Sequence, residues 1–196
     1  CQLWKSWGLK AEGMLGHSIG EYVAATEAGV MSFEEAVEVV AIRGRLMQRL
    51  EPGAMLAVML GREELAGKLG DHEVEVAAYN GPKQTVVSGT PAAIGGLAQA
   101  LKDQGVGCKE LATSHAFHSR MMEPMMAEFL SVMKRVKLRS PTQRYFSNLS
   151  GRWVRAEEVV RAEYWVEHLR RPVEFAAAIQ ELKAEGGWVF VEVGPG

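Results

Sequence analysis

An alternation of strand-like and helix-like segments between residues 54 and 112 constrains the fold more than any other feature of this chain. Apolar, β-branched runs bounded by glycine and proline turns predict strands, and Thr90 followed by a proline predicts the start of a helix. The expected order is strand, helix, strand, strand, helix, strand, over residues 54–60, 62–69, 74–80, 84–89, 90–104 and 108–112. This order is typical of a ferredoxin-like α+β unit.

The residues on either side of this unit are mostly helical in pattern. Ser32 and Glu35 form a capping box, which predicts a helix to about residue 50. Its expected apolar face has the spacing of one helical stripe and consists of Phe33, Val37, Val40, Gly44 and Met47. Further helices are expected over residues 21–28, 119–136, 156–169 and 173–184, with a strand over 144–148. The final run W-V-F-V-E-V predicts a strand inside a parallel sheet.

These patterns predict an α/β protein with two subdomains. The large subdomain is expected to be hydrolase-like, with a parallel sheet that is incomplete in this chain, and the ferredoxin-like small subdomain is inserted into it. The expected boundaries are 1–52 for the first part of the large subdomain, 53–113 for the insert and 114–196 for the second part. The chain opens on Cys1 without an initiator methionine and stops at V-E-V-G-P-G, so we expect a piece of a longer protein, truncated at both ends.

Composition excludes several classes of protein. With 196 residues, 47% of them hydrophobic, the chain can bury one sizeable core. A net charge of −2 with acids and bases intermixed gives no general attraction to nucleic acid or to an anionic membrane. No apolar run approaches the roughly 20 residues that span a bilayer, and no signal peptide is visible, so a cytoplasmic protein is expected. Cys1 and Cys108 lack metal-like spacing and fit a reducing compartment, although a disulfide between them remains an alternative.

The segment G-H-S-I-G, residues 16–20, matches the nucleophile-elbow pattern. Small residues on both sides of Ser18 allow the chain to turn sharply from a strand into a helix, which presents the serine hydroxyl. The amides at the start of that helix, especially that of Ile19, are placed to hold an oxyanion. The alternative is a glycine-flanked turn in which Ser18 only caps the helix.

A nucleophilic serine needs a base within hydrogen-bond reach, and the chain has five histidines. His17 is adjacent to the serine and is expected to point away from it, while His72 and His168 lie in a charged loop and on a helix. His115 and His118, in S-H-A-F-H-S, occur where the small subdomain returns to the large one, so either is placed to reach a cleft between them. A surface or hydrogen-bonded core position remains the alternative for each.

Arg43 lies at the edge of the apolar face of its helix, close to Ala36, Val39 and Met47. A guanidinium there requires an anion. One interpretation is an internal ion pair or a side chain that extends to solvent. The other is a paired donor for a substrate carboxylate.

Together these residues resemble the acyltransferase domain of modular type I polyketide synthases, related to the malonyl-CoA:acyl-carrier-protein transacylases. The resemblance covers the whole chain and includes G-H-S-I-G-E-Y, I-R-G-R-L-M-Q, N-G-P-K-Q-T-V-V-S-G, H-A-F-H-S, S-N-L-S-G, Y-W-V-E-H-L-R-R-P-V-E-F and V-E-V-G-P-G. It implies that Ser18 is the nucleophile, His118 its base and Arg43 the carboxylate-binding residue. Asn80, His17, Ile19, His115 and Phe117 are the other implied substrate-site residues.

The resemblance also implies a reaction. A malonyl unit passes from coenzyme A, through a serine ester, to the phosphopantetheine thiol of an acyl carrier protein, with no permanently bound cofactor and no metal. Main-chain carbonyls near V-G-P-G are expected to orient the histidine. The carrier protein and a neighbouring ketosynthase domain are the implied partners. The motif H-A-F-H resembles malonyl-selecting domains, because Phe117 fills the space that an α-methyl branch needs, a discrimination of about 1–3 kcal/mol.

One feature departs from the family, and two alternatives remain. The family begins with a G-Q-G segment whose glutamine flanks the oxyanion site, and residues 1–14 do not supply it. The first alternative is an α/β serine hydrolase, which predicts an acidic partner for the histidine and no cation at the acyl group. The second is an inactive fragment that only docks a carrier protein, for which the basic run at residues 134–144 is the candidate surface.

Overall fold

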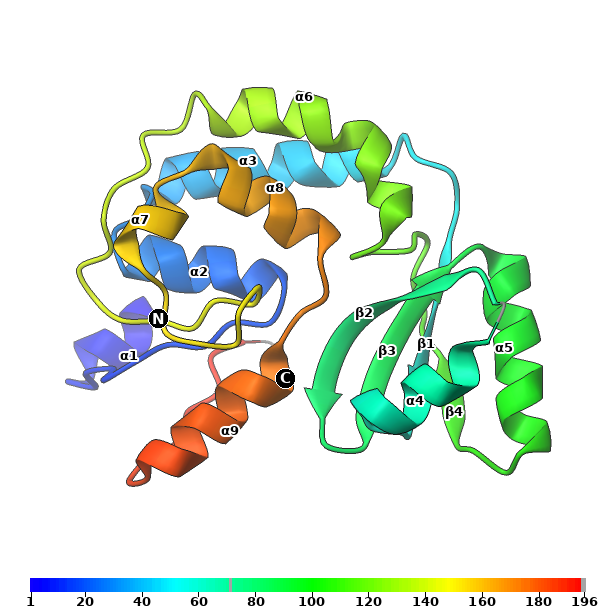
Figure 1. Ribbon diagram of the computed structural model, residues 1–196. Coiled ribbons are helices and arrows are strands. Elements are labelled where there is room, and N and C mark those ends of the chain that lie inside the picture. Colours follow the sequence, from blue (N-terminus) through cyan, green and yellow to red (C-terminus); the bar gives the residue numbers. More distant parts are fainter. Residues whose placement is uncertain (71, 195–196) are drawn as a thin grey trace.

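A four-stranded antiparallel sheet forms the smaller of two lobes in the computed structural model, which describes residues 1–70 and 72–194 (Figure 1). The strand order is β2-β3-β1-β4, and the elements follow the predicted alternation closely. They are β1 (Ala54–Val58), α4 (Arg62–Leu69), β2 (Val74–Gly81), β3 (Gln84–Gly89), α5 (Pro91–Asp103) and β4 (Cys108–Glu110). This strand order confirms the ferredoxin-like unit.

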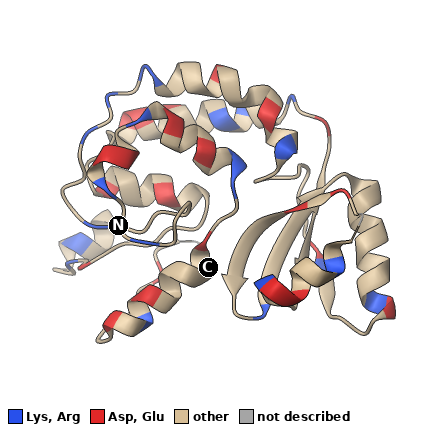
Figure 2. Cartoon of the chain, viewed as in Figure 1, with Lys and Arg blue, Asp and Glu red and all other residues tan. Residues whose placement is uncertain are grey.

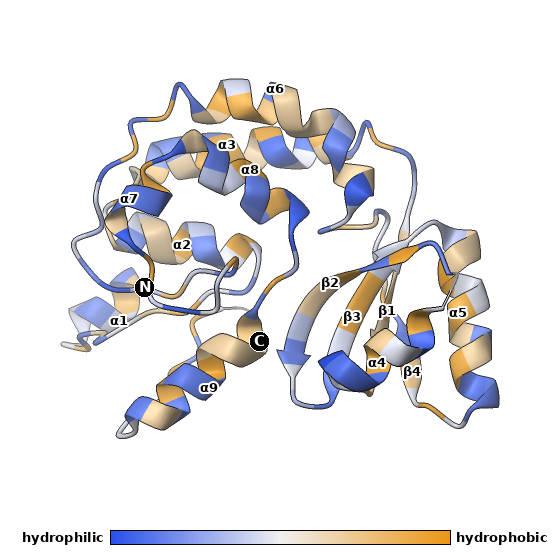
Figure 3. Cartoon of the chain, in the orientation of Figure 1, coloured by the Kyte–Doolittle hydropathy of each residue, from blue (hydrophilic) through white to orange (hydrophobic). Residues whose placement is uncertain are grey.

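The two faces of this sheet bury different partners. Leu56 of β1 lies opposite Val87 of β3, and both pack with Leu97 in the cluster that includes the helices α4 and α5. The side chains that point the other way belong to a second cluster, which includes Met55, Ala77, Ala78, Val86 and Val173. Figure 3 shows the hydrophobic residues of β1, β3 and α5 in orange. Since Val173 comes from the larger lobe, the second face is the seam between the lobes.

The larger lobe is helical, and α2, α3, α6 and α8 lie together in it (Figure 1). Its elements are α1 (Gln2–Ser6), α2 (Ile19–Glu27), α3 (Phe33–Met47), a short 3-10 turn (Arg120–Met122), α6 (Glu123–Met133), α7 (Ala156–Val159), α8 (Ala162–Arg170) and α9 (Phe175–Glu185). Tyr22, Phe129 and Trp165 are among its largest fully buried side chains. The helix expected over residues 156–169 is therefore two helices, α7 and α8.

Helix α3 begins as predicted, but the prediction of its apolar face was wrong. Ser32 Oγ accepts from the Glu35 amide at 3.1 Å, and the Glu35 carboxylate accepts from the Ser32 amide at 2.8 Å, which is a complete capping box. Phe33 and Val37 are 70% and 51% exposed. The buried face is Ala36, Val39, Arg43, Leu46 and Met47. Two neighbouring stripes of this helix are both rich in apolar residues, and packing against α2 and α6 selects the one that includes Arg43.

Among the residues that the structure describes, the parallel sheet of the larger lobe is represented by one parallel bridge, between Met14 and Tyr145. The strand expected over residues 144–148 reduces to bridges at Tyr145 and Phe146. Residues 188–193 form no strand, and Val189 is 89% exposed. A strand is stabilised by hydrogen bonds to a neighbouring backbone, and no described segment pairs with this run. Pro195 and Gly196 lie outside the described residues.

The two lobes are joined through Val173, in the segment between α8 and α9. Its amide donates to the Ala77 carbonyl at 2.9 Å, and its carbonyl accepts from the Tyr79 amide at 2.9 Å, which adds one residue to the edge of β2. Acidic and basic residues are interspersed over both lobes (Figure 2). Both cysteines are free. None of the described helices combines the length and the apolar character that crossing a membrane would require.

Candidate active site

Ser18 stands at the turn that starts α2, in a backbone conformation that L-residues rarely adopt. Its φ is 50° and its ψ is −111°. A Cβ atom on Gly16 would lie 2.0 Å from the carbonyl carbon of Gly20, so the turn is tight enough to require glycine at position 16. The Ser18 side chain does not cap α2. Its Oγ instead lies 2.8 Å from Nε2 of His118, which argues against the alternative of a capping serine.

His118 is held so that its free nitrogen faces the serine. The ring is buried, and Nδ1 donates to the carbonyl of Arg171 at 3.0 Å, which leaves Nε2 to accept from the Ser18 hydroxyl. Burial is the largest cause that lowers the pKa of His118 to about 3, and electrostatic interactions with His168 and Arg43 act in the same direction. A neutral imidazole at physiological pH is the form that a general base needs. The carbonyl that orients His118 is that of Arg171, in the segment between α8 and α9, and the last two residues of the expected V-G-P-G loop lie outside the described residues.

Arg43 projects into the protein from α3 and is 6% exposed. No carboxylate of a described residue pairs with it, and its Nε lacks an acceptor among the described residues. Its guanidinium carbon lies 5.9 Å from the centre of the Tyr22 ring. Burial lowers the pKa of the guanidinium. Because Arg43 also lowers the pKa of His118, the cation lies within electrostatic reach of the Ser18–His118 pair.

The other residues of the expected site lie at different places around this pair. His17 Nε2 is 2.8 Å from Asn80 Oδ1, so the residue beside the serine contacts β2 of the smaller lobe. Ile19 is the first residue of α2, and its amide has no recorded acceptor among the described residues. His115 uses both ring nitrogens internally, at 2.8 Å from Ser114 Oγ and 3.3 Å from the Leu50 carbonyl oxygen. Phe117 is half-buried and packs against the cores on both sides of the seam.

A family profile described as acyl transferase domain matches residues 1–196. The chain belongs to the acyl transferase domain family. It is 44% identical over 196 residues to polyketide synthase GfsB from Streptomyces halstedii, a match that covers 97% of this chain and 4% of that protein. It is 44% identical over 191 residues to mycoketide-CoA synthase from Mycobacterium tuberculosis, a match that covers 97% of this chain and 5% of that protein. The chain thus spans only a small part of these relatives.

Solved structures give the same family. The acyltransferase domain from the second module of the salinomycin polyketide synthase is 43% identical, with a TM-score of 0.88 over 94% of this chain and 44% of that one. The malonyl CoA-acyl carrier protein transacylase from Burkholderia pseudomallei is 30% identical, with a TM-score of 0.86 over 94% and 64%. Both confirm that this acyl transferase domain has the expected fold.

Asn148 is a residue of the acyl transferase site that the sequence did not single out. Its Oδ1 accepts from the Ser18 amide at 2.6 Å, and its Nδ2 donates to the Gly16 carbonyl at 2.7 Å. Both bonds hold the strained turn from outside. The only sequence signal was the motif S-N-L-S-G, which lies about 130 residues away along the chain, and the contact depends on tertiary folding.

The two alternative functions predict features that the described residues do not provide. A serine hydrolase predicts an acidic partner for the histidine, but Nδ1 of His118 contacts a main-chain carbonyl, and a cation lies nearby. For the docking fragment, two arginines of the basic run already have acidic partners. Arg139 lies 3.4 Å from Glu35, and Arg144 lies 3.8 Å from Glu185.

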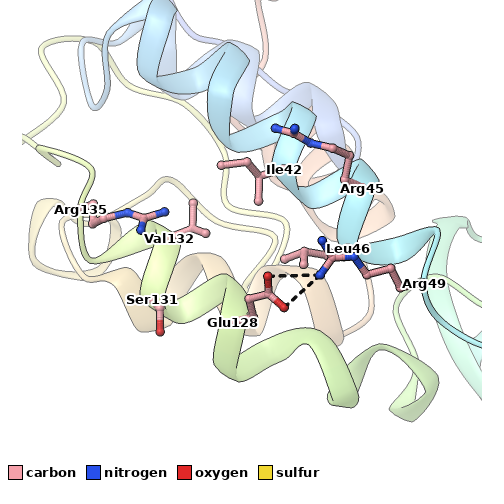
Figure 4. A pocket seen from close by; sticks show the side chains of 8 residues that line it. All are labelled: Ile42, Arg45, Leu46, Arg49, Glu128, Ser131, Val132 and Arg135. Atoms are coloured by element: carbon pink, nitrogen blue, oxygen red, sulfur yellow. Dashed lines mark hydrogen bonds and ion pairs between the residues drawn. The ribbon is translucent and has the colours of Figure 1, made fainter.

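A groove of about 300 Å³ lies between α3 and α6, away from this site (Figure 4). Its walls include Arg45, Arg49 and Arg135, and Arg49 bonds Glu128 at 3.3 Å. Arg45 follows Arg43 by two residues and therefore points to the opposite side of α3. The groove is separate from the Ser18–His118 pair.

Proposed function

We propose that this domain transfers a malonyl unit from coenzyme A, through an ester on Ser18, to the phosphopantetheine thiol of an acyl carrier protein. The observation that carries the proposal is the 2.8 Å contact between Ser18 Oγ and a buried, neutral His118. One structural neighbour is described as a malonyl CoA-acyl carrier protein transacylase, which supports the same substrate class. No permanently bound cofactor takes part in this reaction.

The first half-reaction acylates the serine. Nε2 of His118 takes the Ser18 proton while Oγ attacks the thioester carbonyl carbon. The amide of Ile19, at the positive end of α2, donates to the oxyanion that forms. When the intermediate collapses, the carbon–sulfur bond breaks, and the coenzyme A thiolate takes the proton back from the imidazolium. The products are malonyl-Ser18 and free coenzyme A.

The second half-reaction reverses the roles. His118 takes the proton from the phosphopantetheine thiol, and the sulfur attacks the ester carbonyl of malonyl-Ser18. The proton returns to Ser18 Oγ as the ester bond breaks. The Arg171 carbonyl fixes the imidazole in the same tautomer during both halves, because Nδ1 keeps its proton throughout.

Arg43 selects the acyl group in this proposal. Its planar guanidinium is suited to a bidentate pair with the free carboxylate of a malonyl unit. A buried cation without a described partner is costly for the folded protein, and the substrate carboxylate would relieve that cost. His17, Asn80 and Phe117 border the acyl site from the smaller lobe and the seam.

The proposal extends to the setting of the reaction. In this proposal the acyl site lies in a cleft between the large subdomain, residues 1–52 and 114–196, and the small subdomain, residues 53–113. An acyl carrier protein is the acceptor partner, and a ketosynthase domain is the expected neighbour in a polyketide synthase of the cytoplasm.

A test is intact-mass analysis of the full-length protein after incubation with malonyl-, methylmalonyl- or acetyl-coenzyme A. We expect malonyl-Ser18 to accumulate and then to disappear when carrier protein is added. Rapid loss to water without carrier protein would favour a hydrolase. No acylation of Ser18, with carrier binding intact, would favour a docking module.

The variant Arg43→Ala tests the role of the cation. We expect it to depress malonyl transfer at least tenfold more than acetyl transfer, because only the malonyl group has a carboxylate that can bind the guanidinium. One lost charged hydrogen bond corresponds to about 1.5–3 kcal/mol. Arg45→Ala is the matched control, because it removes an exposed arginine from the other face of the same helix. Equal losses on both donors would contradict the assignment.

A further inference from the structure

Glu21 is a buried carboxylate that the proposed reaction does not use. It lies one helical turn after Ser18 in α2 and is completely buried. Among the described residues it is the one carboxylate in the buried set. Burying an ionised carboxylate is costly unless it is hydrogen-bonded or paired, so its position requires an explanation.

Three contacts surround the Glu21 carboxylate, one from the turn at Asn148 and two from α8. The backbone amide of Asn148 donates to Glu21 Oε2 at 2.7 Å. The Tyr164 hydroxyl of α8 donates to Oε1 and lies 2.7 Å from Ser147 Oγ. His168 Nε2, one turn further along α8, approaches Oε2 to 3.2 Å. Glu21 therefore links α2, the turn at Asn148 and α8.

His168 extends this group toward the catalytic pair. Its ring is buried, and the centre of the ring lies 6.3 Å from that of His118. Neither ring nitrogen of His168 makes a well-aligned hydrogen bond to a described residue, despite the 3.2 Å approach to Glu21. His168 therefore lies next to the Glu21 carboxylate without an aligned hydrogen bond to it.

The charges around His118 show why such an anion matters. When His118 takes the Ser18 proton, an imidazolium forms in a buried site that already contains Arg43. The partner of Nδ1 is a neutral carbonyl, so no adjacent carboxylate offsets the new charge. Electrostatic interactions are stronger in a buried site than in water. Glu21 is the buried carboxylate available to offset it, and His168 lies between Glu21 and His118.

We propose that Glu21, a buried carboxylate behind the dyad, positions Ser18 and offsets the positive charge that develops on His118. The proposal rests on the function proposed above. Glu21 acts by two routes. It anchors the backbone of Asn148, whose side chain holds the Ser18 turn on both sides. Its negative charge also lies behind the dyad, with His168 between Glu21 and His118. Glu21 is a positioning residue, because it does not touch the acyl group.

The test compares Glu21→Gln with wild type in the full-length protein. Glutamine keeps the size of the side chain and an oxygen that can accept from Asn148, but it removes the charge. We expect the rate of Ser18 acylation at saturating malonyl-coenzyme A to fall about tenfold or more. The KM is expected to stay within about twofold of wild type, since Glu21 does not contact the acyl donor.

Glu35→Gln is the matched control. Glu35 is also a carboxylate that accepts from two backbone amides, at 2.8 Å from Ser32 and 3.0 Å from Lys137, but it lies at the start of α3 with no path to the dyad. We expect this variant to lose stability and to keep the acylation rate. An unchanged rate in folded Glu21→Gln, or an equal loss in both variants, would overturn the proposal.

Two further measurements distinguish a failure of the proposed function from a failure of the role proposed for Glu21. Labelling of Ser18 by a fluorophosphonate reports on the nucleophile without a malonyl group. A wild-type protein that reacts with this probe but not with malonyl-coenzyme A would refute the proposed function, and the Glu21→Gln comparison would still stand with the probe. If Glu21→Gln does not fold, Asn148→Ala replaces it, because it removes the side chain that links Glu21 to the Ser18 turn while Glu21 stays in place. A wild-type labelling rate in that variant would overturn the positioning role of Glu21.

Discussion

At the scale of single residues, both members of the catalytic pair occupy backbone positions that usually belong to glycine. Ser18 and His118, with φ values of 50° and 57°, are the non-glycine residues with positive φ among those described. Such conformations cost about 1–3 kcal/mol each and persist where the surroundings hold them. Asn148 holds Ser18 on both sides, and the Arg171 carbonyl holds the ring of His118. These contacts hold both strained residues and so fix the alignment of the Ser18 hydroxyl with the His118 imidazole.

The low pKa of His118, about 3, predicts an unusual pH dependence of the reaction. The base must be neutral, and an ordinary histidine loses that form as the pH falls through about 6.5. We expect the rate of Ser18 acylation to stay nearly constant from pH 8 down to about pH 5. A midpoint near pH 6.5 would contradict the burial argument.

The lowered pKa of His118 also predicts that the free energy of unfolding depends on pH. Because burial depresses the folded-state pKa of His118, the unfolded chain binds more protons between about pH 3 and pH 6.5. The free energy of unfolding should therefore fall as the pH falls through this window. Urea titrations of wild type and His118→Asn at several pH values check this, because asparagine tolerates positive φ and does not titrate. The difference in the free energy of unfolding between wild type and His118→Asn should become smaller as the pH falls.

At the scale of elements, α3 carries both a stability determinant and a functional cation. Its first turn is closed by the reciprocal bonds between Ser32 and Glu35, and Glu35 also accepts from the Lys137 amide at 3.0 Å. These bonds lower the pKa of Glu35, with the Ser32 amide as the largest cause. Further along, the same helix presents Arg43 to the interior.

The variant Ser32→Ala tests this capping box. We expect the free energy of unfolding to fall by about 1 kcal/mol, within the usual range of about 0.5–2 kcal/mol for a lost cap. Urea denaturation measures it. Ser131→Ala is the control, because that exposed hydroxyl bonds only the Ala127 carbonyl of its own helix. A cost no larger than that of the control would show that packing alone fixes the start of α3.

At the scale of the whole molecule, the site depends on how the two lobes meet. The segment between α8 and α9 supplies the Arg171 carbonyl to His118 and the Val173 backbone to β2, and Glu174 donates its amide to the Asn148 carbonyl at 2.8 Å. Ion pairs cross the seam as well, since Arg170 of α8 lies 2.7 Å from Glu75 of β2. One short segment therefore ties the smaller lobe to both members of the catalytic pair.

A substitution at Phe117 tests whether the seam between the lobes determines the choice between malonyl and methylmalonyl groups. Phe117 packs between the cores of the two lobes, one residue before His118. We expect Phe117→Ser to raise methylmalonyl relative to malonyl transfer by about 10-fold or more, since one methyl group is worth about 1–3 kcal/mol in such a pocket. Competition between the two coenzyme A esters, read by intact mass, measures the ratio. An unchanged ratio would show that another part of the seam excludes the branch.

The comparison of sequence and structure separates local from long-range features. The six elements of the smaller lobe and the capping box of α3 were predicted, because alternation, turn residues and caps are properties of a few consecutive residues. The exposed face of α3, with Phe33 and Val37, was not predicted, since the sequence allowed two apolar stripes. The strand expected over residues 188–193 was not found, because a strand also needs a partner.

The sequence by itself determined which residue types were available for chemistry: a serine between glycines, a histidine that follows an aromatic residue, and an arginine on an apolar helix face. The family resemblance implied His118 as the base, but the residues alone left His115 and His118 open, and only the tertiary structure decided which of them meets Ser18 and what holds it there. The residues concerned lie about 100 and 130 positions from the serine, and folding gives His115 and His118 different hydrogen bonds. Local interactions are set by neighbouring residues, whereas a site assembled from distant segments exists only once the core has packed.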